Sequence, residues 1–324
     1  MEKLQWTKRL NQEKAENIYL KHLGQPYKEY RQLWEKAGCN YLPDFPIHID
    51  IEVIDACNLR CIYCFRNEDM QNRLGYKVNT GMEFPMKLYI KVLSEGQRHG
   101  LRAINLGFSG ECLMRKDLCE MINLAYKNGV LDIRLITNGT LLTKDMVGDL
   151  LDSHATFIGI SIDAGTPEKY IALKGIDYFN RLRSIVKYIN QKKVDLKKDL
   201  PLIRVSYYHS EEDIGDKEKF LKEFQEYVDF IDFKELVNIN NKRNENIRMD
   251  CRMPFQRLAV FANGDVSACC SIFFSKKLII GNLYKMSLKE IWDSEEIQSI
   301  RRGLIKEDPV AICKECLGSV SSSL

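Results

Sequence analysis

The chain has 324 residues, 45% hydrophobic and 29% charged, a composition typical of a globular protein with a substantial core. Its 48 basic and 45 acidic side chains give a net charge of +3 without any basic block, so nucleic acid is not expected as a partner. Eleven cysteines occur without a recognisable secretory signal or an apolar stretch long enough to cross a membrane. They favour metal binding or catalysis in a reducing cytoplasm over disulfide bonding, and no membrane partner is expected.

The first 46 residues are expected to form a short helical extension. Two polar helices are predicted in it, at 10–22 and 26–37, and Gly38 with the prolines that follow ends the second.

From residue 47 onward, short apolar runs alternate with helical patterns. Strands are predicted at 47–54, 103–108, 131–137, 156–162, 202–208 and 230–236. Helices are predicted between them, at 85–98, 115–128, 143–152, 177–192 and 216–227. This alternation indicates βαβ units around a parallel sheet, and six units are too few for a closed barrel. We therefore expect an α/β fold, a partial (β/α)6 TIM-like barrel, over residues 47–240.

The polar run 238–248 predicts a linker, and a small C-terminal domain is expected at 241–324. Within that domain Asn263-Gly264 separates two apolar runs, which indicates a two-residue hairpin turn. Ser287 and Glu290 form a capping box that is expected to open a helix at 288–301.

Directly after the first barrel strand, three cysteines follow the spacing C-x3-C-x2-C: Cys57, Cys61 and Cys64. Three thiolates so close in sequence can bind one face of a cube-shaped iron–sulfur cluster and leave one iron open. Structural zinc prefers four ligands in two pairs, so zinc fits less well. Buried free thiols are the other alternative.

This cysteine loop resembles that of the radical S-adenosylmethionine (SAM) superfamily, and Tyr63 fills its aromatic position. The resemblance implies that Cys57, Cys61 and Cys64 hold a 4Fe-4S cluster and that SAM chelates the open iron. It further implies that one electron, from a donor such as flavodoxin or ferredoxin, splits SAM into methionine and a 5′-deoxyadenosyl radical. That radical removes a hydrogen atom from the substrate.

Three further motifs can be matched to the family, each at the carboxyl end of a predicted strand, where parallel sheets place their sites. Ser109-Gly110-Glu111 resembles the G-G-E motif, which implies that Glu111 pairs with the methionine ammonium. Thr137-Asn138-Gly139 and Ser161-Ile162-Asp163 resemble the T-N-G and S-L-D signatures near the ribose. The residues implied to bind the cofactor are Tyr63, Ser109, Gly110, Glu111, Thr137, Asn138, Ser161 and Asp163.

A second group of cysteines lies in the C-terminal module, in the order Cys251, Cys269, Cys270, Cys313 and Cys316. The pattern resembles a reduced SPASM or twitch domain. It implies a second 4Fe-4S cluster, with the ligands Cys251, Cys269, Cys313 and Cys316. A zinc ribbon is the alternative. Cys270 could replace Cys269 as ligand, donate a hydrogen atom, or pack as a small hydrophobic residue.

Two barrel residues are further catalytic candidates. Arg204 is expected to face the lumen, where its guanidinium could bind a carboxylate of substrate or SAM. Cys112 stands where the family has proline; it could quench a substrate radical or simply pack. On the first strand His48, Asp50 and Glu52 are also expected to face the lumen, either as a polar substrate site or paired with other charges.

These features together predict a cytoplasmic radical SAM oxidoreductase with two 4Fe-4S clusters. The expected reaction is dehydrogenation or epimerisation of a polar small molecule, similar to a carbohydrate or aminocyclitol. A peptide maturase is the first alternative. A zinc-stabilised interaction protein without catalysis is the alternative from another class.

Overall fold

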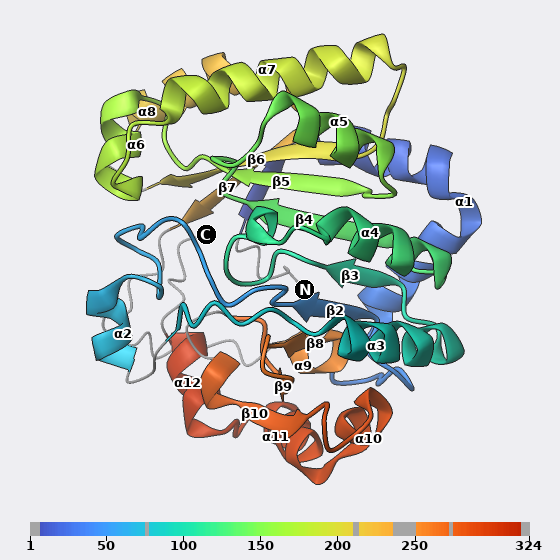
Figure 1. The fold of residues 1–324 in the computed structure, drawn as a ribbon. Coiled ribbons are helices and arrows are strands. Elements are labelled where there is room, and N and C mark those ends of the chain that lie inside the picture. The colour runs from blue at the N-terminus through green and yellow to red at the C-terminus, as the bar shows by residue number, and fades with distance from the viewer. Residues whose placement is uncertain (1–6, 75–77, 210–213, 236–250, 272–274, 319–324) are drawn as a thin grey trace.

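Six parallel strands form the centre of the structure, a computed structural model that describes residues 7–74, 78–209, 214–235, 251–271 and 275–318. They are β2 (His48–Ile51), β3 (Ala103–Asn105), β4 (Asp132–Thr137), β5 (Phe157–Ser161), β6 (Leu202–His209) and β7 (Phe230–Glu235). Each is hydrogen-bonded to the next in chain order. The expected six-unit partial barrel is confirmed, and the carboxyl ends of its strands point to the left in Figure 1.

Further strands extend this sheet at both edges within the described residues. At one edge β1 (Thr7–Leu10) pairs antiparallel with β7, which was not expected. At the other edge β8 (Arg257–Val260) pairs parallel with β2, followed antiparallel by β9 (Asp265–Ser267) and β10 (Ile279–Asn282). The predicted hairpin is therefore confirmed and continues the barrel sheet, but its turn is longer than the two residues expected. The Gly264 N–H donates to the Phe261 carbonyl and the Phe261 N–H to the Asp265 carbonyl, and Gly264 takes the positive φ of 83°. The predicted linker and the 240/241 boundary lie outside the described residues.

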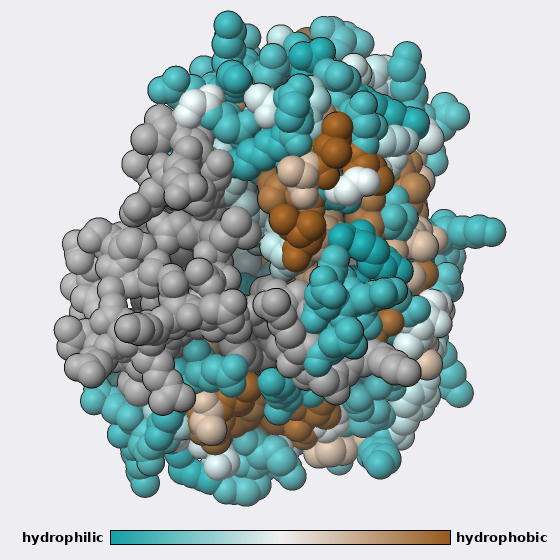
Figure 2. Space-filling view, turned by 90° about the vertical axis from the view of Figure 1, so that its left-hand side faces the viewer, coloured by the Kyte–Doolittle hydropathy of each residue, from teal (hydrophilic) through white to brown (hydrophobic). Residues whose placement is uncertain are grey.

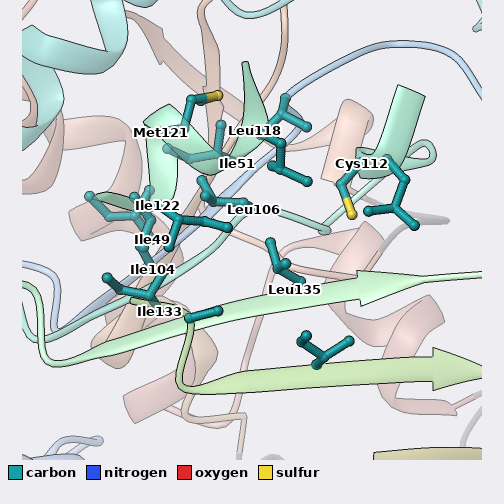
Figure 3. Packing of buried hydrophobic residues seen from close by; sticks show 14 of the residues in the cluster. Ile49, Ile51, Ile104, Leu106, Cys112, Leu118, Met121, Ile122, Ile133 and Leu135 are labelled. Atoms are coloured by element: carbon teal, nitrogen blue, oxygen red, sulfur yellow. The ribbon is translucent and has the colours of Figure 1, made fainter. Parts of the chain in front are cut away.

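Helices cover the outer face of the sheet (Figure 1). They are α3 (Met86–His99), α4 (Leu118–Lys127), α5 (Lys144–Asp152), α6 (Pro167–Lys174), α7 (Phe179–Asp195) and α8 (Ile214–Phe224). Figure 3 shows how Ile49, Ile104 and Ile133 of the strands meet Met121 and Ile122 of α4. Burial of each such side chain stabilises the fold by about 1.5–3 kcal/mol, which is why the apolar positions of each strand point outward, towards the helices.

The N-terminal segment covers the opposite end of the barrel from the cysteine loop (Figure 1). The two predicted helices form one element, α1 (Gln12–Lys36), bent at Gly24 with φ 59° and ψ −147°. Only glycine adopts that backbone without strain. The bend stacks Tyr19 on Tyr27 at 4.8 Å between ring centroids, and both rings pack towards Phe157 of β5. α1 therefore closes the amino ends of the strands.

The capping box predicted at Ser287 and Glu290 is confirmed, but the helix it opens is shorter than expected. α10 (Leu288–Asp293) ends at Ser294, and α11 (Glu295–Ile305) begins directly after it. The extended backbone of Ser294 makes the break, and the acidic first turn of α11 favours a new helix start there. Two short helices complete the module, α9 (Met253–Gln256) and α12 (Ala311–Gly318).

Trp292 of α10 joins this module to the N-terminal segment. It is fully buried, its Nε1 donates to the carbonyl of Pro43 at 2.8 Å, and the Arg301 guanidinium lies 4.0 Å from its ring centroid. We expect Trp292→Ala to lower the free energy of unfolding by about 3–5 kcal/mol, through the cavity it creates. Trp292→Phe should cost about 1–3 kcal/mol, because the Pro43 carbonyl loses its donor.

Urea unfolding measures both effects. Tyr284→Ala is the control, since Tyr284 is 64% exposed in the same module, and it should change stability by less than about 0.5 kcal/mol. Equal losses for Trp292→Ala and Tyr284→Ala would contradict the prediction.

Candidate functional site

The cysteine loop, residues 57–64, lies at the carboxyl end of β2, on the face that Figure 2 turns to the viewer. The thiols of Cys57, Cys61 and Cys64 are partly buried and close enough to interact electrostatically with one another. Burial raises the pKa of the Cys61 thiol to about 11, although the nearby Lys174 ammonium opposes the rise. The predicted triplet is therefore brought together.

A buried arginine anchors this loop and was missed by the sequence analysis. Arg66 is 1% exposed and follows Cys64 by two residues. Its Nη2 donates to Glu52 at 2.7 Å and to Ser109 at 2.9 Å, and its Nη1 donates to Asp55 at 2.8 Å. One guanidinium thus ties the loops after β2 and β3 together. The only signal in the sequence was a basic residue beside a cysteine triplet.

The G-G-E-like turn forms a closed carboxylate site. Gly110 has φ 76°, and a Cβ there would lie 2.3 Å from the Ile54 carbonyl oxygen, so this position needs glycine. Glu111 is 1% exposed and accepts hydrogen bonds from the Thr137 hydroxyl at 2.5 Å and the Asn138 backbone N–H at 2.7 Å. Burial raises the pKa of Glu111, while these bonds favour its charged form.

Asn138 connects the carboxylate site to the cysteine loop. Its backbone N–H binds Glu111, and its side-chain amide lies 3.8 Å from the Cys57 sulfur and donates to Asn58 at 2.9 Å. The T-N-G and G-G-E-like motifs, far apart in sequence, therefore meet beside the first cysteine.

The S-L-D-like motif lies on the other side of the loop. Asp163 is fully buried with φ 66°, and its carboxylate accepts from the Tyr63 hydroxyl at 2.7 Å and the Lys174 ammonium at 2.6 Å. Ser206 also donates to it at 2.9 Å, and Ser161 lies opposite Ser206 in the sheet. Lys174 was missed because a lysine in the last turn of a helix is ordinary.

The two barrel candidates lie in different surroundings. Arg204 faces the lumen at 2% exposure, and its Nη1 donates to Asp232 at 2.9 Å. Its Nη2 lies over Gly159, where a Cβ would be 2.3 Å away. Cys112 is fully buried in the main core (Figure 3), and its sulfur lies 3.4 Å from the carbonyl oxygen of Ile136. This position favours the packing alternative for Cys112.

The expected lumen charges on β2 are buried and paired. Asp50 accepts from Arg257 at 3.1 Å and lies 3.2 Å from His48, and Glu52 accepts from Arg66. Of the two alternatives for these charges, the structure therefore supports pairing.

The fold gathers the auxiliary cysteines, Cys251, Cys269, Cys270, Cys313 and Cys316. Cys313 and Cys316 lie on α12, while Cys269 and Cys270 follow β9. Cys251, Cys269 and Cys316 each interact electrostatically with Cys270. Burial raises the pKa of Cys251 and of Cys316 to about 12. Cys270 packs on Phe108 and Phe261, next to Arg257.

Both groups of thiols suit iron–sulfur clusters by the chemistry of their donors. Within the described ranges, no three histidine, cysteine or carboxylate side chains converge as around a single metal ion. A cluster binds its cysteines through separate iron atoms, so they need not converge on one point.

Removing the Arg66 guanidinium should destabilise the chain. Arg66→Met leaves Glu52 and Asp55 buried without their cation, and we expect a loss of about 3–5 kcal/mol in the free energy of unfolding. Arg66→Lys keeps the charge but not the fork of donors, so its loss should be smaller.

Denaturant unfolding and iron content after anaerobic reconstitution measure the effect. Arg98→Met, on the exposed side of α3, is the control. A wild-type stability for Arg66→Met would contradict the anchoring role.

A profile of the radical SAM superfamily matches residues 51–231, and one of an iron–sulfur cluster-binding domain, SPASM, matches residues 251–317. Among curated relatives, a probable GTP 3′,8-cyclase of Methanocaldococcus jannaschii is 30% identical over 146 residues, 45% of each chain. A GTP 3′,8-cyclase of Thermodesulfovibrio yellowstonii is 33% identical over 127 residues, 39% of this chain and 38% of that protein. The matches thus span less than half the length of these relatives.

Solved structures share the fold. Streptococcus suis SuiB bound to its precursor peptide SuiA has a TM-score of 0.59 at 17% identity, covering 85% of this chain and 70% of SuiB. BtrN in complex with AdoMet and 2-DOIA has a TM-score of 0.53 at 19% identity, covering 82% of this chain and 89% of BtrN.

None of the described helices is long and apolar enough to cross a membrane. With more than half of its length matched, this chain belongs to the radical SAM superfamily and carries a SPASM domain at its C-terminal end.

Proposed function

We propose that this chain is a radical SAM oxidoreductase acting on a polar small molecule. The observation that carries the proposal is the meeting of Cys57, Glu111 and Asn138 at the carboxyl ends of the strands. A buried carboxylate beside a thiol triplet suits a ligand that chelates iron and also presents an ammonium group. The alternative of a zinc-stabilised interaction protein does not agree with membership of this superfamily.

Cys57, Cys61 and Cys64 are proposed to hold the first 4Fe-4S cluster, because three adjacent thiols supply its usual ligands and leave one iron for SAM. When bound, the cluster and SAM supply a 5′-deoxyadenosyl radical that takes a hydrogen atom from the substrate. Around them the loop is held by Arg66 on one side and by Tyr63 and Asp163 on the other.

Glu111 is proposed to bind the methionine ammonium. An ammonium would stabilise the charged form that burial disfavours, and Thr137 and Asn138 hold the carboxylate in place. Ser109 and Gly110 shape this turn, which suits the close approach of a ligand to the backbone. Ser161, Asp163 and Tyr63 are proposed to border the adenosine end of SAM, with Lys174 holding Asp163 in its buried position.

A second 4Fe-4S cluster is proposed on Cys251, Cys269, Cys313 and Cys316. Cys270 then stays a thiol, packed against the cluster of Phe108, Ala259 and Phe261 and next to Arg257. We propose it as hydrogen donor to the substrate radical, which would complete an epimerisation and leave a thiyl radical that one electron from the external donor and one proton would restore to the thiol. Loss of an electron to the second cluster and of a proton to solvent would instead complete a dehydrogenation. The electron for SAM cleavage would come from a donor such as flavodoxin or ferredoxin.

A carbohydrate or aminocyclitol-like substrate agrees with the polar lumen, where Arg204 and Asp232 are proposed to contact it. BtrN, whose structure holds 2-DOIA, is a neighbour in fold. A peptide substrate is the second candidate, because SuiB with its bound precursor peptide is also similar in fold. GTP, the compound named for the curated relatives, belongs in the same substrate screen.

Cysteine variants test the proposed function by two readouts, iron content and 5′-deoxyadenosine formation under reductant. The wild type should hold about eight irons. Cys57→Ala, Cys61→Ala and Cys64→Ala should lose SAM cleavage to background and fall to about four irons. Cys251→Ala and Cys313→Ala should also fall to about four irons but keep SAM cleavage, because their thiols lie in the other group.

Cys39→Ala and Cys119→Ala are matched controls, since neither thiol lies in a motif, and they should behave as wild type. Reconstituted wild-type protein that takes up no iron, or triplet variants that still cleave SAM, would exclude the proposal.

Isotope labelling can distinguish the two candidate hydrogen donors, Cys270 and Cys112. In D2O, a product quenched by an exchangeable thiol gains deuterium at the reacting carbon. Cys270→Ala should reduce that incorporation to background while leaving about eight irons. Cys112→Ala should leave it unchanged, because Cys112 is buried under the sheet. Unchanged deuterium in the Cys270 variant would remove Cys270 from the reaction.

A further inference from the structure

A cavity of about 310 Å³ lies at the amino ends of the parallel strands, beneath α1. In Figure 1 this is the right-hand end of the barrel, opposite the cysteine loop. Its α1 wall is aromatic, with Tyr19, Tyr27, Tyr30 and Trp34. Its strand wall is polar, with His48, Asp50, Asn105, Asp132, Arg134 and Arg257.

A layer of residues separates this cavity from the proposed SAM site. Ile136, Gly159, Arg204 and Phe230 are neighbours in register across four strands. Ile136 and Phe230 border the cavity, and the Arg204 guanidinium fills the space over Gly159. On β6 the next residue after Arg204 that points into the barrel is Ser206, and its hydroxyl donates to Asp163. On the side of β4 to β7 this layer closes the cavity, or chamber, towards the SAM site.

The carboxylates in this chamber are already well supplied with donors. Asp50 accepts from Asn105 at 2.9 Å and Arg257 at 3.1 Å, and His48 lies 3.2 Å from it. Asp132 likewise accepts from Arg134 at 3.1 Å and from a threonine hydroxyl at 2.7 Å. Bound in this way, the carboxylates offer little to a cationic ligand.

By contrast, each guanidinium group keeps N–H donors that its carboxylate partner does not use. Each carries five N–H donors. Among the described residues, one nitrogen of Arg134 binds Asp132 and one nitrogen of Arg257 binds Asp50. The Arg257 guanidinium also contacts the Cys270 thiol, and its buried Nε has no hydrogen-bond partner. Stacking fixes both planes: Arg134 lies 3.8 Å from the Phe157 ring centroid and Arg257 lies 4.8 Å from that of Trp34. Both line the cavity, so they face a common space.

We propose that this chamber binds a small organic carboxylate, held by Arg134 and Arg257 with its apolar part against the tyrosines and Trp34. An arginine fork matches the two oxygens of a carboxylate, and the aromatic wall of α1 matches a flat apolar body. The chamber opens beside Gln12, Glu16 and Arg31, which lie partly exposed on α1, so a ligand can enter without crossing the SAM site. The proposal goes beyond the proposed function and does not depend on it.

Benzoate and benzamide form a matched pair of probes, equal in shape and different in charge. In calorimetry on the intact, reconstituted chain, benzoate should bind and benzamide should bind at least tenfold more weakly. Equal binding of the two, or no binding of benzoate, would overturn the proposal. Tighter binding of inorganic phosphate than of benzoate would overturn the assignment to a carboxylate.

Substitutions of the chamber arginines test whether benzoate binds in this chamber. Arg134→Met and Arg257→Met should each weaken benzoate at least tenfold, and Arg98→Met on α3 should not. Both arginines have buried partners, so their variants can also lose stability, and tryptophan fluorescence gives a test that leaves the arginines in place. Benzoate should change the fluorescence of the wild type, and Trp34→Phe should remove that change. The buried Trp292 remains in the variant as a reporter of folding. Benzoate binding that survives both arginine variants, or a fluorescence change that survives Trp34→Phe, would show that the ligand binds elsewhere.

Discussion

The arrangement of the site depends on the buried Arg66 guanidinium. The cysteine loop has no regular secondary structure, so the sheet does not fix it through a hydrogen-bond ladder. Arg66 does so instead, because its donors are shared among Glu52 at the end of β2, Asp55 in the same connection and Ser109 beyond β3. Buried charges of this kind are tolerated only when each has its partner, so the loops must keep one relative position for the carboxylates to be satisfied.

A second buried pair acts from the other side of the loop. Lys174 and Asp163 are almost fully buried, and Tyr63 bonds to both. The loop is therefore held between two groups of buried charges, Arg66 with its two carboxylates on the β2–β3 side and Lys174 with Asp163 on the β5–α6 side. Such fixed surroundings suit a site in which a radical must meet one hydrogen atom and no other, since positioning is the protein's main contribution to cofactor chemistry.

The sequence predicted what depends on local pattern. All six barrel strands, the Asn263-Gly264 hairpin and the Ser287 cap follow from periodicity and turn chemistry, and the structure contains them. It could not predict pairings between distant residues: β1 against β7, or Arg66 with Ser109, depend on which loops the closed fold brings together. Arg204 was expected to face the lumen and does, but its Asp232 partner lies on the next strand and could not be inferred from alternation alone.

The relation between the two cysteine groups follows from the sheet. β8 pairs with β2 residue for residue, from His48 with Arg257 to Ile51 with Val260. The cysteine loop leaves the carboxyl end of β2, and the hairpin that carries Cys269 and Cys270 begins with β8. Both groups are thus attached to neighbouring strands of one hydrogen-bonded sheet, and the separation between them is set by backbone hydrogen bonds. Electron exchange with a substrate held between two clusters would need a rigid separation of this kind. A SPASM domain joined only by a flexible linker could not provide it.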